Sequence, residues 1–153
     1  MGFAMWRVRQ GEPRHAASWL RLRSALWPDG PVEEHRENIE RYFEGRLRNP
    51  VAVFLAEDDA GQAVGFAELS IRLYAEGCLS DRVAYLEGWY VEPERRNQGI
   101  GRALIAAAEA SGREQGCTEF ASDADPTNDT SIAAHGALGF TDAGLIRCFR
   151  KDL

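Results

Sequence analysis

Cysteine is scarce in this 153-residue sequence, which contains only three. Cys78, Cys117 and Cys148 show neither CxxC nor zinc-binding spacing, and their odd number argues against a disulfide framework. We therefore expect three reduced thiols and no metal site. A nucleophilic cysteine stays open as an alternative, although no paired histidine motif accompanies any of the three.

Long apolar runs and a secretion signal are also absent. Runs such as Leu104–Ala108 are far shorter than a bilayer-spanning helix requires. Residues 1–5 contain neither a basic segment nor the apolar core of a signal peptide. These features predict a cytoplasmic protein with no membrane partner.

An excess of positive charge is missing too. The chain has 18 Lys and Arg against 24 Asp and Glu, a formal net charge of −6 at pH 7. This balance argues against a nucleic-acid partner, because binding to nucleic acid depends on clustered basic residues that neutralise phosphates. An acidic cleft could instead attract a cationic substrate, although acidity is also common in proteins without any electrostatic role. The length predicts one domain, residues 1–153, with its own core.

The most informative stretch joins a strand to a helix. Aromatic and β-branched residues predict a strand over Val83–Val91, which Pro93 ends because proline has no N–H for a ladder. After a polar loop, apolar residues at helical spacing predict a helix from about Ile100. Two glycines at the joint allow close approach of a ligand, and the free amides at the helix start suit a pyrophosphate.

Neither the Rossmann pattern G-x-G-x-x-G nor the P-loop pattern is present, and a plain strand–loop–helix is the alternative. The longer pattern V-x-P-x-x-R-x-x-G-x-G, from Val91 to Gly101, resembles motif A of the GNAT N-acetyltransferases, which use acetyl-CoA. The expected order of elements, β-α-α-β-β-β-α-β-α-β, is also that of the GNAT fold. Its second helix is expected over about Val32–Leu47 and its last strand over Phe140–Lys151.

The resemblance covers nearly the whole chain and implies an α/β (α+β) fold. In that fold a central mixed, mostly antiparallel twisted sheet is flanked by about four helices. A bulge near Gly88 would splay the central strand and expose backbone groups to the pantetheine arm. The amide of Val91 would then polarise the thioester carbonyl. The implied cofactor-binding residues are Trp89, Tyr90, Val91, Arg96, Asn97, Gln98, Gly99, Ile100, Gly101, Arg102, Ala103 and Asn128.

A narrower resemblance comes from three other segments. Leu86–Val91, Glu119–Ala124 and Leu26–Asp29 look like the aminoglycoside 6′-N-acetyltransferases of the AAC(6′)-I type. This implies direct attack of the 6′-amine of a polycationic antibiotic on acetyl-CoA in a ternary complex, without a metal, conferring resistance. Such enzymes often form homodimers, sometimes with C-terminal strands that cross between subunits.

The resemblance also implies the residues that act on the amine. Asp123 is the first candidate for the base and Glu87 the second, and both would contact the substrate. The family's pocket further suggests Trp27, Tyr74 and Asp142. Aromatic rings and carboxylates suit such a cation. Five other acids are expected to be surface charges: Glu68, Glu76, Asp81, Asp125 and Asp129.

His135 holds the position where many GNAT enzymes place a tyrosine that protonates the leaving thiolate. Imidazole titrates near neutrality, so His135 could be a general acid, or it could be a bystander. Three other functions stay open. One is acetylation of another small amine, such as a polyamine or amino acid. The second is an acetyl-CoA-binding sensor without catalysis. The third is acetylation of a peptide or ribosomal protein.

Overall fold

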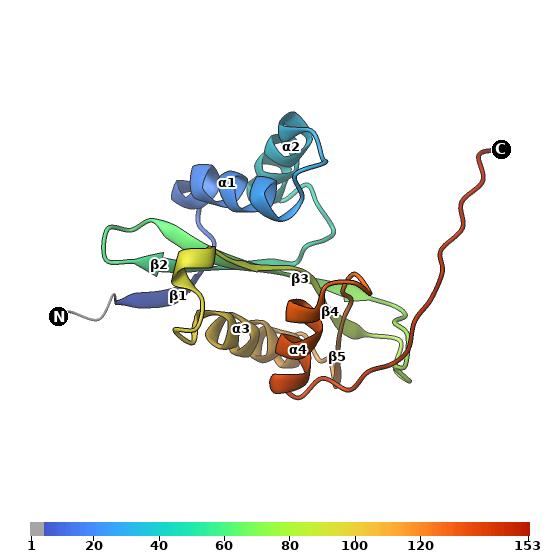
Figure 1. The fold of residues 1–153 in the computed structure, drawn as a ribbon. Coiled ribbons are helices and arrows are strands. Elements are labelled where there is room, and N and C mark those ends of the chain that lie inside the picture. Colours follow the sequence, from blue (N-terminus) through green and yellow to red (C-terminus); the bar gives the residue numbers. More distant parts are fainter. Residues whose placement is uncertain (1–4) are drawn as a thin grey trace.

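The computed structural model describes residues 5–153; residues 1–4, which belong to the segment examined for a signal peptide, lie outside the described part. Figure 1 shows the order of elements, which follows the expected order except for the last strand. The elements are β1 (Trp6–Gln10), η1 (Pro13–His15), α1 (Ala16–Leu26), α2 (Val32–Phe43), β2 (Ala52–Asp58), β3 (Ala63–Arg72), β4 (Val83–Val91), η2 (Pro93–Arg95), α3 (Ile100–Glu114), β5 (Glu119–Ser122) and α4 (Asp129–Ala137).

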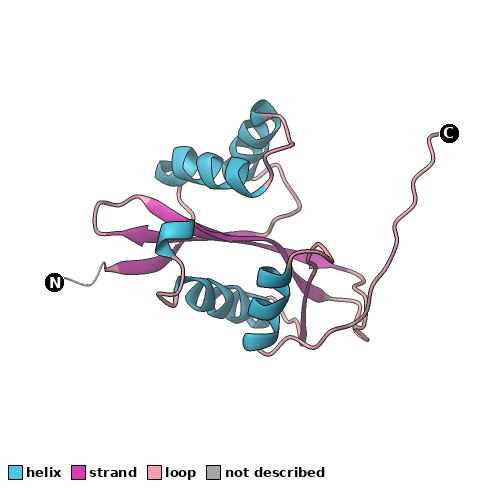
Figure 2. Cartoon of the chain, viewed as in Figure 1, coloured by secondary structure: helices cyan, strands magenta, loops and turns pink. Residues whose placement is uncertain are grey.

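The strands of the described chain form one sheet in the order β1-β2-β3-β4-β5. Neighbours are antiparallel from β1 to β4, and β4 pairs with β5 in parallel. Figure 2 shows α1 and α2 on one face of the sheet and α3 and α4 on the other. The expected mixed, mostly antiparallel α/β fold is therefore confirmed.

Each face of the sheet has its own apolar core because strand side chains alternate between faces. Trp19 and Leu22 of α1 pack with Phe66 on one face. Leu104 and Ile105 of α3 belong to a second cluster on the opposite face. These two cores hold the helices against the sheet. The loops at the end of β4 are not part of either core and are therefore available to form a binding site.

The second helix is shorter than expected. It ends at Phe43 rather than near Leu47. Gly45 has a positive φ of 70°, a conformation that glycine adopts at helix ends without a Cβ penalty. The apolar spacing that continued to Leu47 was therefore misleading, because a glycine stop overrode it.

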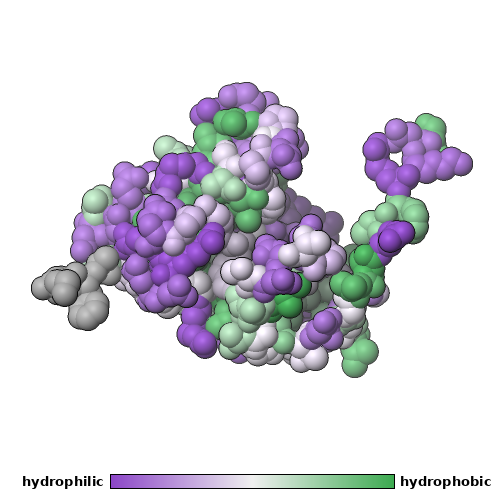
Figure 3. Space-filling model, in the orientation of Figure 1, coloured by the Kyte–Doolittle hydropathy of each residue, from purple (hydrophilic) through white to green (hydrophobic). Residues whose placement is uncertain are grey.

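The expected last strand, Phe140–Lys151, is wrong for this chain. Residues 140–153 form neither helix nor strand, and Figure 1 shows this segment leaving the body of the protein. A strand needs a neighbour for its backbone hydrogen bonds, and within the described chain this segment has none. Its apolar residues are left exposed, with Phe149 at 89%, and they line the projecting segment in Figure 3.

Two further expectations concern the chain as a whole. Cys78, Cys117 and Cys148 are all free thiols, so the prediction of unpaired cysteines is confirmed. Among residues 5–153, no helix has the length and apolar character that crossing a membrane would need.

Candidate functional site

The pairing between the parallel strands β4 and β5 stops halfway along β4, where the two strands separate. They pair only between Val83–Leu86 and Glu119–Ser122. Beyond Leu86, β4 continues to Val91 with no β5 partner among the described residues. The exposed edge of this half-strand offers backbone N–H and C=O groups to a ligand. Asp123 follows β5 directly at the point where the strands separate.

A bulge in β4 lies at the same place. Glu68 pairs with Gly88 and Leu69 pairs with Leu86, so Glu87 is an extra residue on β4. A bulge bends its strand and increases the local twist, which accounts for the separation from β5. The bulge expected near Gly88 is therefore present.

Because Gly88 has no side chain, the indole ring of Trp27 can pack directly against the β4 backbone. A Cβ at this position would lie 2.7 Å from Cη2 of Trp27 and 3.1 Å from Oε2 of Glu68. Trp27 follows α1 and stacks on His35, so the α1–α2 turn places its ring directly over the bulge. The structure thus places Trp27, a predicted substrate contact, at the point where β4 and β5 separate.

The start of α3 has the geometry of an anion site. Gly99 is the N-cap with φ 85° and provides no side-chain cap, and Asn97 also has a positive φ of 64°. The first amides of a helix have no acceptor within the helix, so those after Gly99 remain free for a ligand. Arg96 and Arg102 are exposed beside them. These features fit the pyrophosphate of acetyl-CoA.

The aromatic residues at the end of β4 have structural roles in addition to any ligand contact. Trp89 donates from Nε1 to the carbonyl oxygen of Gly101 at 3.2 Å, which ties β4 to the start of α3. Tyr90 packs against the core on the opposite face. Arg96 donates from Nε to the carbonyl oxygen of Val91 at 2.9 Å. The side chains of Trp89 and Tyr90 thus position the strand, and the backbone faces the opening.

The two predicted acids lie in one connected group of side chains. Arg72 donates to both oxygens of Glu87, at 2.9 and 2.8 Å, and these hydrogen bonds raise the pKa of Arg72. The same guanidinium lies 3.5 Å from the centre of the Tyr85 ring. Tyr85 donates its hydroxyl to Asp123. Burial and the hydrogen bond to Asp123 raise the pKa of Tyr85 above its usual range.

Glu68 was expected to be a surface charge, and that expectation is wrong. Its side chain is buried under α1, and Arg23 Nη1 lies 3.1 Å from Oε1. Burial raises the pKa of Glu68 to about 7, although the charge of Arg23 acts in the opposite direction. The one signal in the sequence was that Glu68 interrupts the mostly apolar run Ala63–Leu69. The other four acids expected on the surface are exposed: Glu76, Asp81, Asp125 and Asp129.

His135 lies on α4 with both ring nitrogens engaged. Nε2 is 2.8 Å from the hydroxyl of Ser122, and Nδ1 is 2.7 Å from the carbonyl oxygen of Ser131. Because a carbonyl only accepts, Nδ1 carries the proton of the neutral ring. The ring also meets Trp89 edge to face, with centroids 5.4 Å apart. Its role as general acid stays a prediction.

Three further predicted residues lie around this centre. The side chain of Asn128 accepts from the amide of Ser131 at 3.0 Å and caps α4. Tyr74 and Asp142 are exposed on the β3–β4 loop and the C-terminal segment. These two segments are close, since a Cβ at Gly77 in that loop would lie 2.8 Å from Cβ of Ala143. Neither residue hydrogen-bonds to Glu87 or Asp123 within residues 5–153.

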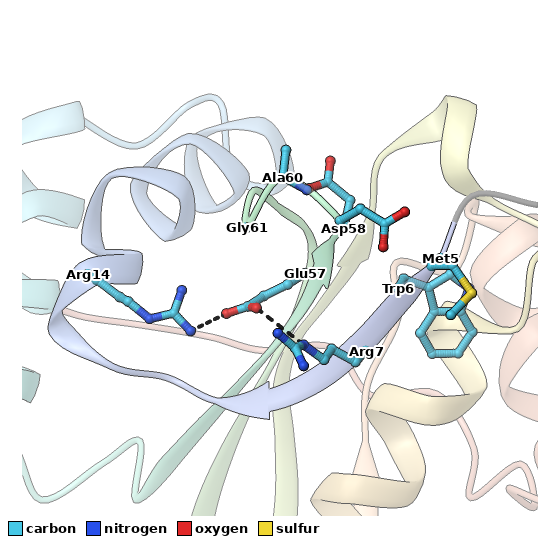
Figure 4. Close-up of a pocket in the computed structure, with 9 residues that line it drawn as sticks. Met5, Trp6, Arg7, Arg14, Glu57, Asp58, Ala60 and Gly61 are labelled. Atoms are coloured by element: carbon cyan, nitrogen blue, oxygen red, sulfur yellow. Dashed lines mark hydrogen bonds and ion pairs between the residues drawn. The ribbon is translucent and has the colours of Figure 1, made fainter.

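A separate surface pocket of about 620 Å³ lies at the edge formed by β1 and β2 (Figure 4). Its centre is the buried carboxylate of Glu57, which contacts His15 and Arg14 at 2.5 Å and Arg9 at 3.3 Å. Burial favours the neutral acid, but the hydrogen bonds from His15 and Arg14 outweigh it and lower the pKa of Glu57. None of the predicted site residues lines this pocket, and its ion pairs tie β1 and η1 to β2.

The described residues, 5–153, contain no group of three or more His, Cys, Asp or Glu side chains that could hold a metal ion. The residues around the end of β4 are suited to binding organic ligands rather than a metal ion. An extended ligand with a pyrophosphate can bind along the free strand edge and the start of α3. A cationic group can bind at Glu87 and Asp123, on the side of the sheet covered by α1.

Comparison with known proteins agrees with this arrangement. The chain matches the model of the acetyltransferase (GNAT) family over residues 19–140. It is 53% identical over 146 residues to an aminoglycoside N(6′)-acetyltransferase type 1 of Klebsiella aerogenes, covering 95% of this chain and 96% of the relative. A protein of the same name from Stenotrophomonas maltophilia is 43% identical over 149 residues, covering 95% and 93%.

Solved structures share the fold. The aminoglycoside N-acetyltransferase AAC(6′)-Iy in complex with CoA matches with a TM-score of 0.91 and 38% identity, covering 99% of this chain and 98% of that one. AAC(6′)-Iy in complex with the bisubstrate analogue CoA-S-monomethyl-acetylneamine matches with a TM-score of 0.90 and 38% identity, covering 98% and 100%. Since the family match includes both the parted strands and the start of α3, this chain belongs to the GNAT family of acetyltransferases.

Proposed function

We propose that this protein transfers the acetyl group of acetyl-CoA to the 6′-amine of aminoglycoside antibiotics and so confers resistance to them. The observation that carries this proposal is the meeting of two sites at the β4 bulge. A free strand edge that leads to an anion-binding helix start lies on one side. On the other side lie the carboxylates of Glu87 and Asp123, and the ring of Trp27 lies against the neighbouring Gly88.

The chemistry follows from these positions. The amide of Val91 and its neighbours on the free edge would hold and polarise the thioester carbonyl, as backbone donors do for a developing oxyanion. Asp123 would bind the acceptor ammonium and accept its proton, and Glu87 would hold a second positive charge. The amine then attacks acetyl-CoA directly in a ternary complex. As an imidazolium, His135 would donate a proton from Nε2 to the oxygen of Ser122, while the Ser122 hydroxyl passes its own proton to the departing thiolate.

The exposed C-terminal segment supports a homodimer. An extended segment with apolar side chains in water is an unfavourable arrangement for an isolated chain. Pairing of residues 140–151 with a second copy of the chain would cover Leu145, Ile146 and Phe149. We expect the enzyme to act in the cytoplasm, because acetyl-CoA is available there.

The test is release of free CoA from acetyl-CoA, followed with a thiol reagent. Tobramycin, which has a 6′-amine, is compared with paromomycin, which has a 6′-hydroxyl, with spermidine and with no acceptor. Turnover with tobramycin and not paromomycin is expected. Turnover with spermidine alone would assign another small amine, and binding of acetyl-CoA with no turnover would favour the sensor.

The role of Asp123 has its own test. Replacing Asp123 by Asn should lower kcat/KM for tobramycin by about 100-fold, because a general base contributes on that order. The control is Asp125→Asn, which changes a nearby exposed acid by the same chemistry. Equal, small effects of the two substitutions would exclude Asp123 as the base.

A further inference from the structure

One side chain of the protein already occupies the place expected for a substrate cation. The guanidinium of Arg72 makes two hydrogen bonds to Glu87 and lies 3.5 Å from the centre of the Tyr85 ring. The hydroxyl of that tyrosine is bound to Asp123. A carboxylate, an aromatic face and a second nearby carboxylate are the groups that recognise an organic cation.

The Arg72 pair differs from the buried ion pair that Arg23 forms with Glu68 on the same face of the sheet. The side chains of Arg72 and Glu87 are 41% and 30% exposed, whereas those of Arg23 and Glu68 are 12% and 3% exposed. Arg72 is the last residue of β3, so its long side chain can turn into water without disturbing the sheet. Arg23 is held between Trp19 and Trp27 and cannot leave in this way.

We propose that Arg72 is an internal cation that fills the acceptor site when no substrate is bound, and that an ammonium of the acceptor replaces it on Glu87. This proposal rests on the cationic acceptor of the proposed function. It makes Arg72 a specificity-determining residue. A substrate with one ammonium group would only replace the Arg72 guanidinium on Glu87, with no net gain of ion pairs. A substrate with several ammonium groups would also bind Asp123. Replacement of Arg72 therefore favours acceptors that carry several positive charges.

The first test compares Arg72→Met with Arg41→Met. Both remove one positive charge, but Arg41 is an exposed residue of α2. Equilibrium binding of tobramycin and of spermidine is measured by calorimetry in the presence of CoA, together with kcat and KM. Arg72→Met should bind both polycations about 2- to 5-fold more tightly, the range for loss of a competing partly exposed ion pair. The KM should fall by more than kcat changes, and Arg41→Met should match the wild type.

The opposite result has a clear meaning. Weaker binding by a folded Arg72→Met protein would show that Arg72 positions Glu87 for the substrate, and the proposal would be wrong. The conservative variant Arg72→Lys separates these roles further. It keeps the charge but loses the paired hydrogen bonds. The proposal expects its affinity to lie between those of the wild type and Arg72→Met.

A second readout uses the wild-type protein and does not depend on any variant folding. The Nε–H signal of Arg72 is followed by NMR while tobramycin is added, with Arg96 as the internal comparison. Displacement predicts a large change at Arg72 as it leaves Glu87. An unchanged Arg72 signal at saturating tobramycin would overturn the proposal. Absence of tobramycin acetylation would contradict the proposed function alone, because displacement by either polycation is read without turnover.

Discussion

Glu68 gives the sharpest quantitative prediction, because its carboxyl group is almost completely buried. The perturbation is Glu68→Gln, which keeps the shape of the protonated acid and removes its titration. Glu68 is 2% exposed and lies beside Arg23, and burial raises its pKa from 4.5 to about 7. Native Glu68 therefore keeps its proton over a pH range in which the unfolded chain has lost it.

The sign and size of the effect follow from this difference. Between about pH 4.5 and 7 the native state binds more protons than the unfolded state, so the wild-type free energy of unfolding falls as the pH rises. At 1.36 kcal/mol per pH unit the full loss is about 3 kcal/mol, most of it between pH 5 and 7. The contribution is fully present below pH 4.5 and lost above pH 7.

The assay is urea unfolding of the wild type and of Glu68→Gln, followed by tryptophan fluorescence between pH 5 and 8.5. The quantity of interest is the difference in unfolding free energy between the two proteins, because other titrating groups cancel. It should shift in favour of the variant by about 2–3 kcal/mol across this range. Glu37→Gln, on the exposed face of α2, should show no such shift. A difference that stays constant with pH would mean that Arg23 keeps Glu68 ionised throughout, and the reasoning would be refuted.

Three further outcomes are expected. Gly88→Ala places a Cβ 2.7 Å from the Trp27 ring, so the ring must move and KM for the acceptor should rise several-fold with little change in acetyl-CoA binding, as measured by calorimetry. Gly112→Ala brings its Cβ 2.9 Å from that of Ala84 and should lower the free energy of unfolding by about 1–3 kcal/mol in urea titrations, despite the better helix propensity of alanine. His135→Ala should lower kcat by about 10-fold or more if this residue protonates the thiolate, and an unchanged kcat at every pH would make it a bystander.

The fold and the cofactor side of the site followed well from local patterns. The strand that ends before Pro93 and the helix that begins at Ile100 both lie where the sequence indicated them. Proline, glycine and the apolar spacing act on the backbone within a few residues of themselves. The conformation at Gly99 needs no distant partner, and so the glycine turn that starts α3 could be predicted from the sequence.

The acceptor side was harder to predict. Glu87 and Asp123, both expected from the sequence, lie in one connected group of side chains, but the part of Arg72 in this group and the burial of Glu68 were missed. Residues on β3 alternate between two faces, and the sequence does not show which face α1 covers. The C-terminal strand was also wrong: its apolar residues indicated a strand, but the described chain has no neighbouring strand with which residues 140–151 pair.

What the sequence determined by itself was the chemistry available at each short segment: a strand with aromatic residues, a glycine loop, a helix start and acids near them. The tertiary structure decided which of these groups meet. The bulge at Glu87 turns Glu87 and Gly88 toward the face that holds Trp27. The antiparallel pairing of β3 with β4 places Arg72 opposite Val83, and from there its side chain extends over the Tyr85 ring to Glu87. Such contacts depend on strand register and on burial, which arise only when distant parts of the chain pack together.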